Sequence, residues 1–343
     1  MLFRSPDGSK DENVFDIRQG TAILFMIKSD KDKACKVAHH ELWGLRAIKY
    51  EWLDAQRLDT ANYKHIKPNS PYYLFHPIIE GYEHYLNWKN MPEIFPVGSV
   101  GIVTARDKLT IHESPEDVRK TIHNFVSLDV EMARTAFKLG KDTRDWKIHY
   151  AQKDVNETGK SDKCIVPILY RPFDERYTYY TGNTKGFHCM PRNEVMKNML
   201  NHNNVGIAFN RNVQIQFSHV LIADKPIDLH LLETGMKGAY FAPLYIYPEE
   251  HNEDIFASTE REYNIAPELI DRFSKLWPDF EPEQLFYYIY AILHSNIYRE
   301  RYAQYLKMDF PRIPFTENYE LFTELAELGK ELADIHLLKS PLL

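Results

Sequence analysis

The sequence has almost no cysteine, no long apolar run and no signal segment. Cys35, Cys164 and Cys189 are spread over 343 residues, which is too few and too scattered for a disulfide framework or a zinc site. No run of about 18 apolar residues occurs, so no membrane span is expected. The first residues lack the apolar stretch of a signal peptide. We therefore expect a chain that works in a reducing cytoplasm and has no membrane partner.

The motifs of common catalytic sites are also missing. The sequence contains no glycine-rich dinucleotide loop, no Walker loop, no His-Glu-x-x-His and no nucleophile elbow. His39 and His40 are adjacent, so on a strand they would face opposite sides and could not bind one metal ion together. His219 and His230 stand alone on apolar stretches. We expect no metal site and no catalytic residue, and interpret the chain as a binding module that is not an enzyme by itself.

One fragment leaves a catalytic alternative open. Asp145-Trp146-Lys147 has the Asp-x-Lys form of magnesium-dependent nucleases, in which carboxylates bind the metal and the lysine steadies the attacking water. Such a site needs a second acid on a neighbouring strand, and Glu116 or Asp107 is the nearest candidate. A stand-alone nuclease is therefore an alternative interpretation.

The beginning of the chain reads as the end of a larger domain. Two strands are expected over residues 13–17 and 21–28, and the second is almost entirely apolar. A strand that is apolar on both faces belongs inside a layered sheet, and the few residues before it cannot supply one. A short strand over 36–43 and a helix over 46–58 are expected to follow.

The remainder mixes short strands with helices, which predicts an α+β fold that ends in two long helices. We expect a strand at 100–104, helix over 115–139, a strand pair with a turn near Gly182-Asn183, and a short helix over 193–201. One long helix should run from Pro282 to about Leu306. Thr316 should cap the last helix. The apolar positions expected to face the core of that helix are Leu321, Leu325, Leu328, Leu332 and Ile335.

A basic, aromatic island interrupts an otherwise acidic chain. Residues 170–180 hold two arginines and a cluster of aromatic rings, side chains suited to phosphates and base edges. From Lys160 to Asn212, eight basic residues stand against four acidic ones, a net charge of +4 in a chain whose net charge is −7. A basic face on an acidic body can bind a polyanion in one orientation.

Several short blocks, in order along nearly the whole chain, carry a family resemblance. They are residues 13–17 with Gly20 and Ile23, 42–44 with Lys49, Tyr50 and Leu53, 101–107, 145–147, 170–176, 286–295 and 309–314. Together they resemble the C-terminal part of Type ISP restriction–modification enzymes. Such enzymes are long polypeptides in which a nuclease, a helicase-like ATPase, an adenine methyltransferase and a target-recognition domain follow one another.

The resemblance implies a division of the chain and a role for it. Residues 1–70 would be the end of a methyltransferase domain, contributing edge strands of its α/β fold, and residues 71–343 a DNA target-recognition domain. The chain would read a short site in double-stranded DNA, so that the methyltransferase can modify an adenine within it. The Asn-Pro-Pro-Tyr motif of those methyltransferases is absent from the sequence.

The cofactors and partners follow from the same resemblance. S-adenosylmethionine, ATP and magnesium are expected only in the full-length enzyme, and none in this chain. The implied partners are DNA and the methyltransferase and helicase portion of the same polypeptide or operon. A scaffold that docks a methyltransferase without touching DNA is a further alternative.

Candidate DNA contacts divide into backbone clamps and base readers. The candidates for phosphates are Arg171, Arg176, Lys185 and Lys197. The candidates for base edges are Arg192, Asn210, Arg211, Gln214 and Gln216. Tyr179 and Tyr180 could form a stacking platform, with only one of them facing DNA.

The island also has a purely structural interpretation. Arg171 and Asp174 could pair to fix the turn, and Phe173 is expected in the core rather than between bases. For Arg171, Asp174 and Arg176 we favour a scaffold or phosphate role over base reading.

Overall fold

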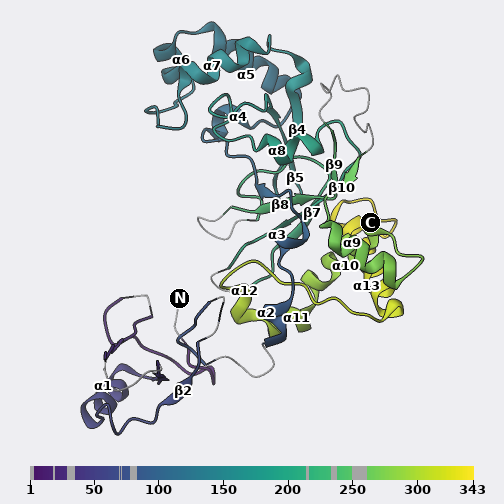
Figure 1. The fold of residues 1–343 in the computed structure, drawn as a ribbon. Helices are drawn as coiled ribbons and strands as arrows, with labels where there is room; N and C mark the ends of the chain where they lie inside the picture. The colour runs from purple at the N-terminus through teal and green to yellow at the C-terminus, as the bar shows by residue number, and fades with distance from the viewer. Residues whose placement is uncertain are drawn as a thin grey trace. The chain divides into compact units, whose positions relative to one another are not determined.

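The computed structural model describes residues 4–17, 20–28, 35–68, 70, 72–77, 83–213, 216–232, 238–248 and 261–343. Figure 1 shows the ribbon, with element labels used below. The chain divides into two compact units, Met1–Leu86 and Asn87–Leu343. The assignment of residues 1–70 to a methyltransferase and 71–343 to a recognition domain stays a prediction.

The first unit is built around a small antiparallel strand pair and one helix. Strand β1 (Val37–His39) pairs with β2 (Lys64–Ile66), and helix α1 (Arg46–Ala55) lies between them in sequence. The Lys49 side chain is buried, and its Nζ lies 2.7 Å from Asp11 Oδ1. This ion pair fastens the N-terminal segment to the helix. Helix α2 (Glu83–Asn87) crosses the boundary between the units.

The two strands expected near the N-terminus are wrong. The described residues of 13–17 and 20–28 have no regular secondary structure, and the apolar run Ile23 to Ile27 is exposed. A β-strand needs a neighbouring strand to pair its backbone groups. No strand among the described residues pairs with this run, so its apolar composition alone does not make it a strand.

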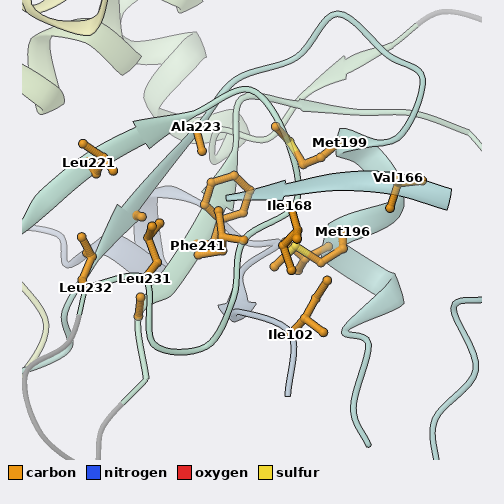
Figure 2. Packing of buried hydrophobic residues seen from close by; sticks show 14 of the residues in the cluster. Ile102, Val166, Ile168, Met196, Met199, Leu221, Ala223, Leu231, Leu232 and Phe241 are labelled. Atoms are coloured by element: carbon orange, nitrogen blue, oxygen red, sulfur yellow. The ribbon is translucent and has the colours of Figure 1, made fainter. Parts of the chain in front are cut away.

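A sheet lies at the centre of the second unit. Its four antiparallel strands follow the order β3 (Ser99–Val100), β8 (Tyr240–Pro243), β6 (Gly206–Phe209) and β7 (Val220–Ala223). Every residue of β6 and β7 is buried. Their short apolar sequences suit strands that are covered on both faces. Figure 2 shows Phe241, Ile168 and Met196 close together in this core. A Cβ atom on Gly206 would lie 2.2 Å from the Phe241 ring, so the sheet core requires glycine there.

A helical lobe lies in sequence between β3 and the other three strands of the sheet. Helix α4 is Asp107–Thr110, α5 is Pro115–Ser127, α6 is Val130–Ala136 and α7 is Ile148–Glu157. Figure 1 shows α5, α6 and α7 gathered together. The predicted helical stretch 115–139 is broken because Asp129 leaves the helical conformation and caps α6, accepting a hydrogen bond from Met132. Trp146 and Phe125 are fully buried in the lobe's own core.

A hairpin joins the two cores. Strand β4 (Ile165–Arg171) pairs with β5 (Asp174–Tyr179). Side chains alternate across a strand, so Val166 and Ile168 pack into the sheet core while Ile165, Tyr177 and Tyr179 pack into the lobe core. The basic, aromatic island is therefore a structural bridge.

Short elements complete this part of the unit. They are α3 (Met91–Ile94), η1 (Asp162–Cys164), α8 (Asn193–Met196), η2 (Lys197–Met199), β9 (Tyr245–Ile246), β10 (Glu262–Tyr263) and α9 (Pro267–Leu276). The predicted short helix over 193–201 is present as α8 and η2.

The C-terminal helices differ from the prediction in their bounds. Helix α10 is Pro282–His294, α11 is Asn296–Arg301, α12 is Ala303–Leu306 and α13 is Tyr319–His336. The single helix expected up to Leu306 is interrupted because Ser295 has an extended ψ of 122° and caps α11. Asn318, not Thr316, caps α13, accepting a hydrogen bond from the backbone of Leu321 at 3.0 Å.

The buried face of α13 is also not the predicted one. Its buried residues are Phe322, Ala326, Gly329 and Ala333, whereas Leu328 is 57% exposed. Helices α10 and α13 pack so closely that a Cβ on Gly329 would lie 2.0 Å from the Tyr287 carbonyl oxygen. Small residues are needed where two helix backbones approach, so the leucines stand beside the contact rather than in it.

The fold is mixed α+β with short antiparallel strands and a long C-terminal helix, which confirms the predicted class. Within the described ranges, no helix is both long enough and apolar enough to cross a membrane.

Candidate nucleic-acid interface

The turn of the β4–β5 hairpin lies within the island, at Pro172-Phe173. Asp174 is the strand partner of Arg171 across it, and the strand register shifts between Leu169 and Arg171. The ion pair expected between these two side chains is wrong, because Arg171 pairs with Asp228 and Asp174 pairs with Arg176. The predicted turn near Gly182-Asn183 is wrong, because β5 has already ended at Tyr179. Phe173 has a φ of 62° and is 56% exposed, so its expected place in the core is wrong too. Its ring lies beside His336, with the ring centres 6.3 Å apart.

Arg171 is held by a buried acid. Its Nη1 donates to Asp228 Oδ1 at 2.8 Å, and its guanidinium lies 3.8 Å from the centre of the Tyr170 ring. The Asp228 side chain is only 2% exposed. Burial raises the pKa of that carboxyl, and the backbone N–H of His230 and the charge of Arg171 oppose the rise. Arg171 is thus the counter-ion of an almost fully buried carboxylate.

The hydroxyl group of Tyr170 belongs to a second acid network. The Tyr170 hydroxyl donates to Asp107 Oδ2 at 2.8 Å, and Thr104 donates to Oδ1 of the same carboxylate. Burial and this hydrogen bond raise the pKa of Tyr170 to about 12. The tyrosine therefore stays a neutral donor and links the hairpin to α4.

Arg176 is also engaged within the chain. Its Nε lies 2.6 Å from Asp174 Oδ1 and its Nη1 lies 2.8 Å from Glu113 Oε1. The structure therefore gives both arginines of the island acidic partners. Their predicted phosphate contacts stay a prediction, and the geometry favours the scaffold role.

The two tyrosines after the island do not form an exposed platform. Tyr179 and Tyr180 are both buried, so the expectation that one ring faces outward is wrong. Strand β5 is covered on both faces and the chain leaves the strand at Tyr180. The Tyr179 hydroxyl contacts Thr158 Oγ1 at 2.9 Å, and that of Tyr180 donates to the Pro191 carbonyl at 3.1 Å.

The remaining phosphate candidates lie beyond the hairpin. Lys185 is exposed, has a φ of 61° and places its Nζ 3.8 Å from Asp145 Oδ1. Lys197 begins η2 and is partly buried. Lys185 therefore lies beside the loop that contains Asp145. Its ion-pair partner is not one of the acidic partners of Arg171 and Arg176.

The base-reading candidates differ sharply in exposure. Arg211 and Gln216 are exposed, and Arg211 pairs with Asp309 at 2.9 Å. Asn210 is 1% exposed, and neither atom of its side-chain amide has a hydrogen-bond partner among the described residues. Arg192 precedes α8 in the left-handed conformation, and its buried Nε also lacks a partner in the described part of the chain. Gln214 lies outside the described residues.

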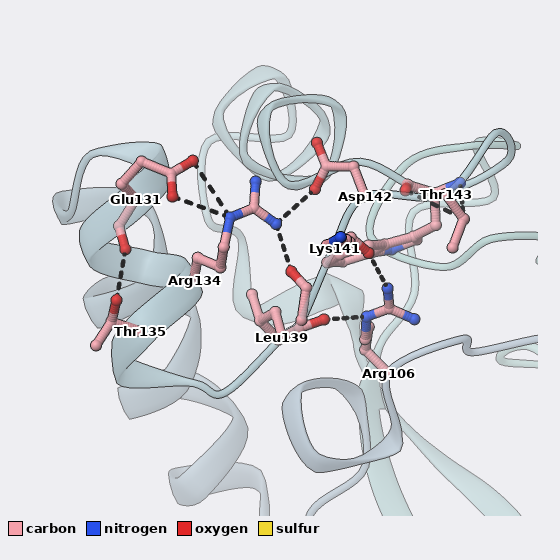
Figure 3. A network of polar contacts seen from close by, with 10 residues as sticks. Arg106, Glu131, Arg134, Thr135, Leu139, Lys141, Asp142 and Thr143 are labelled. Carbon is pink, nitrogen blue, oxygen red and sulfur yellow. Dashed lines mark hydrogen bonds and ion pairs between the residues drawn. The ribbon is translucent and has the colours of Figure 1, made fainter.

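One basic segment was not predicted from the sequence. Lys138, Lys141, Arg144 and Lys147 recur at every third position. Figure 3 shows the loop that carries Lys141, with Arg106 and Arg134 bound to its backbone. The three-residue spacing was the available signal, but only the fold shows that the segment is a tightly held loop.

The nuclease alternative finds no supporting geometry. Asp145 binds Arg144 at 2.9 Å, while Glu116 pairs with Arg119 and Asp107 accepts from Tyr170. Lys147 Nζ lies 5.2 Å from the centre of the Tyr150 ring. Over the part of the chain that the structure describes, no three His, Cys, Asp or Glu side chains gather to hold a metal ion.

Comparison with known families identifies the second unit. Residues 93–342 match the model of the Type ISP C-terminal specificity domain. The chain belongs to this family. The match covers most of the chain and contains the sheet, the helical lobe, the hairpin and the C-terminal helices. No curated protein is similar enough to match the chain.

Three solved structures have a fold similar to that of this Type ISP specificity domain. The cryo-EM structure of a DrdV–DNA complex is 24% identical with a TM-score of 0.59, and the match covers 88% of this chain and 30% of that one. A nuclease-deletion mutant of the Type ISP restriction–modification enzyme LlaGI, in complex with a DNA substrate mimic, is 23% identical with a TM-score of 0.55 and coverages of 89% and 28%. The ATP-dependent Type ISP restriction–modification enzyme LlaBIII, bound to DNA, is 22% identical with a TM-score of 0.56 and coverages of 80% and 18%. The chain therefore spans less than a third of each of these proteins.

Proposed function

We propose that this chain is the DNA target-recognition module of a Type ISP-like restriction–modification enzyme. In that role it positions a target adenine for methylation by a catalytic domain outside these residues. The match of residues 93–342 to the Type ISP specificity domain carries the proposal. The shared fold of three proteins whose structures contain DNA supports it.

The proposed module binds and does not catalyse. S-adenosylmethionine, ATP and magnesium serve the methyltransferase and helicase portions, which belong to the same polypeptide or operon. The chain contributes the contacts to double-stranded DNA and acts in the cytoplasm. Residues 1–70 would join it to the methyltransferase.

In this proposal the candidate residues have different roles. Arg171 and Arg176 fix the hairpin, Lys185 and Lys197 bind phosphates, and the exposed Arg211 and Gln216 read base edges. Such base contacts discriminate by about 1–3 kcal/mol each. For Gln214, the proposed base contact rests on the sequence alone.

Arg192 and Asn210 would read bases after turning outward. Each has a buried polar atom that finds no partner within the described ranges, which costs about 1–3 kcal/mol. A base edge would supply the missing hydrogen bonds, so binding removes this cost. This is the physical reason to keep both residues as base readers although Asn210 is buried.

The proposal is tested by gel shift of the full chain with a mixed-sequence duplex at low and at moderate salt. We expect a complex at low salt that weakens as salt rises, because phosphate contacts release counter-ions. A protein scaffold that ignores DNA would give no complex at either salt concentration, and that result would reject the proposal. Magnesium-dependent nicking of the duplex would instead support the nuclease alternative.

A further inference from the structure

We propose that the loop 138–147 and the neighbouring Lys185 form a preorganised clamp for the phosphates of duplex DNA. Its contact residues are Lys141, Arg144 and Lys185, hereafter the basic clamp. The inference rests on the proposed function, because it states where the duplex backbone is held. It adds Lys141 and Arg144, which were not among the DNA contacts predicted from the sequence.

Two arginines hold the backbone of the loop in place. Arg106 donates from Nε to the Leu139 carbonyl at 2.8 Å and from Nη2 to the Lys141 carbonyl at 2.9 Å. Arg134 Nη1 donates to the Gly140 carbonyl at 2.5 Å and to Asp142 at 2.9 Å. Figure 3 shows these bonds converging on residues 139–142 from Arg134 on α6 and from Arg106, the residue just before α4. Every residue of this stretch is bound by a guanidinium group.

The end of the loop is anchored in the lobe core. Trp146 is fully buried, and its Nε1 donates to the Phe187 carbonyl at 3.1 Å. The backbone N–H of Thr143 donates to the Trp146 carbonyl at 2.9 Å, which closes the turn. The bond from Trp146 to Phe187 also fixes the segment that carries Lys185. Within that segment, the backbone N–H of Lys185 donates to the Cys189 carbonyl at 2.9 Å. The two segments that carry the clamp are therefore held against each other.

The charges of the clamp are not balanced by acidic side chains in the part of the chain that the structure describes. Arg144 is 89% exposed, and it shares the Asp145 carboxylate with Lys185, at 2.9 Å and 3.8 Å respectively. One carboxylate cannot neutralise two cations. Lys141 is exposed and has no ion pair among the described residues. The hydrogen bonds of Arg106 among the described residues go to carbonyl groups, and its guanidinium also lies 4.8 Å from the centre of the Trp146 ring; neither contact cancels its charge.

An ordered loop with unbalanced positive charge is better suited to binding a phosphate backbone than to facing only solvent. A free lysine-rich loop would lose conformational entropy on binding, whereas the loop here is ordered before the ligand arrives. Excess positive charge on an acidic chain attracts a polyanion and orients it. Phosphate contacts carry no sequence information, so the clamp would hold any duplex equally.

The test is the salt dependence of duplex binding by the full chain, with fluorescence anisotropy on a mixed-sequence duplex. The variant K141Q/R144Q removes two contacts and should lower the slope of log K against log salt by about 1.8. Between 50 and 200 mM salt, the wild type should then lose about tenfold more affinity than the variant. Lys185→Gln should reduce the slope by about 0.9. The loss should be equal on any duplex sequence.

Lys153→Gln is the matched control, because Lys153 is exposed on α7 of the same lobe and pairs only with Glu157. It should leave the slope unchanged. Wild-type binding with an unchanged slope in K141Q/R144Q and in Lys185→Gln overturns the clamp alone. A wild-type chain that binds no duplex at low salt rejects the proposed function and the clamp together.

The holding role of Arg106 has its own readout. Arg106→Lys keeps the charge but loses the forked bonds to Leu139 and Lys141. It should weaken duplex binding several-fold while the salt slope keeps its wild-type value, because the contact side chains remain. Wild-type affinity in this variant would overturn the claim that the arginine positions the clamp.

Discussion

Arg171→Gln should destabilise the second unit by an amount that depends on pH. The substitution removes the partner of Asp228, whose side chain is 2% exposed, and leaves the backbone N–H of His230 as its remaining bond. Breaking a fully buried ion pair costs about 3–5 kcal/mol. The Arg171 side chain is 31% exposed, so water can approach the site and we expect about 2 kcal/mol at neutral pH.

The sign of the pH effect follows from the acid. Burial already holds the pKa of Asp228 above its usual 3.8 in the folded state, and loss of Arg171 raises it further. An acid whose folded pKa is raised binds a proton more readily when folded, so the protein gains stability relative to neutral pH as the pH falls through that pKa. The deficit of Arg171→Gln should therefore shrink between neutral pH and about pH 5.

Urea unfolding of the wild type and the variant at both pH values measures this difference. Arg144→Gln is the control, because it removes the same type of group from an exposed ion pair and should change stability by no more than about 0.5 kcal/mol. The double variant R171Q/D228N should recover most of the loss, since no unpaired charge stays buried. An equal deficit at both pH values, or no recovery in the double variant, would refute the reasoning.

Further predictions concern packing, protonation and base reading. Gly329→Ala should destabilise the chain by about 1–2 kcal/mol despite its better helix propensity, since the new Cβ would meet the Tyr287 carbonyl; Leu328→Ala, at an exposed site, should cost much less, and urea midpoints compare them. Burial lowers the pKa of His188 to about 3, so its ring NMR signals should not move between about pH 8 and about pH 5, and a titration near 6.5 would contradict the burial. The same shift means that the unfolded chain takes up this proton first, so His188 makes stability fall as the pH drops below about 6.5. Arg211→Ala should relax the preferred DNA site by about 1–3 kcal/mol at one position, and equal losses on preferred and scrambled duplexes in a competition assay would argue against base reading.

The sequence predicted the class of the fold and the presence of its main elements better than the positions of turns and buried faces. The strand pair at the island and the final helix are both present, because apolar alternation and helical spacing report which elements form. The turn was misplaced because Gly182-Asn183 is the stronger turn signal, whereas the actual turn places Phe173 at positive φ. The core face of α13 was misplaced because close helix packing selects Gly329 and alanines over leucine.

The candidate site depended more on tertiary contacts. Arg171 was identified as a candidate ion-pair residue, but its partner Asp228 is far along the chain and was not foreseen. The basic clamp was missed because its order comes from Arg106, which lies well before the loop in sequence. The apolar run at 21–28 has the composition of a strand, and no neighbour among the described residues pairs with it.

The most direct test of DNA target recognition is selection by the full chain from a pool of randomised duplexes at low salt, followed by sequencing. A target-recognition module should enrich one short motif, and the purified chain should then bind that motif more tightly than its scrambled version. Retention of duplexes without any enriched motif, or of no duplex at all, would contradict the central claim.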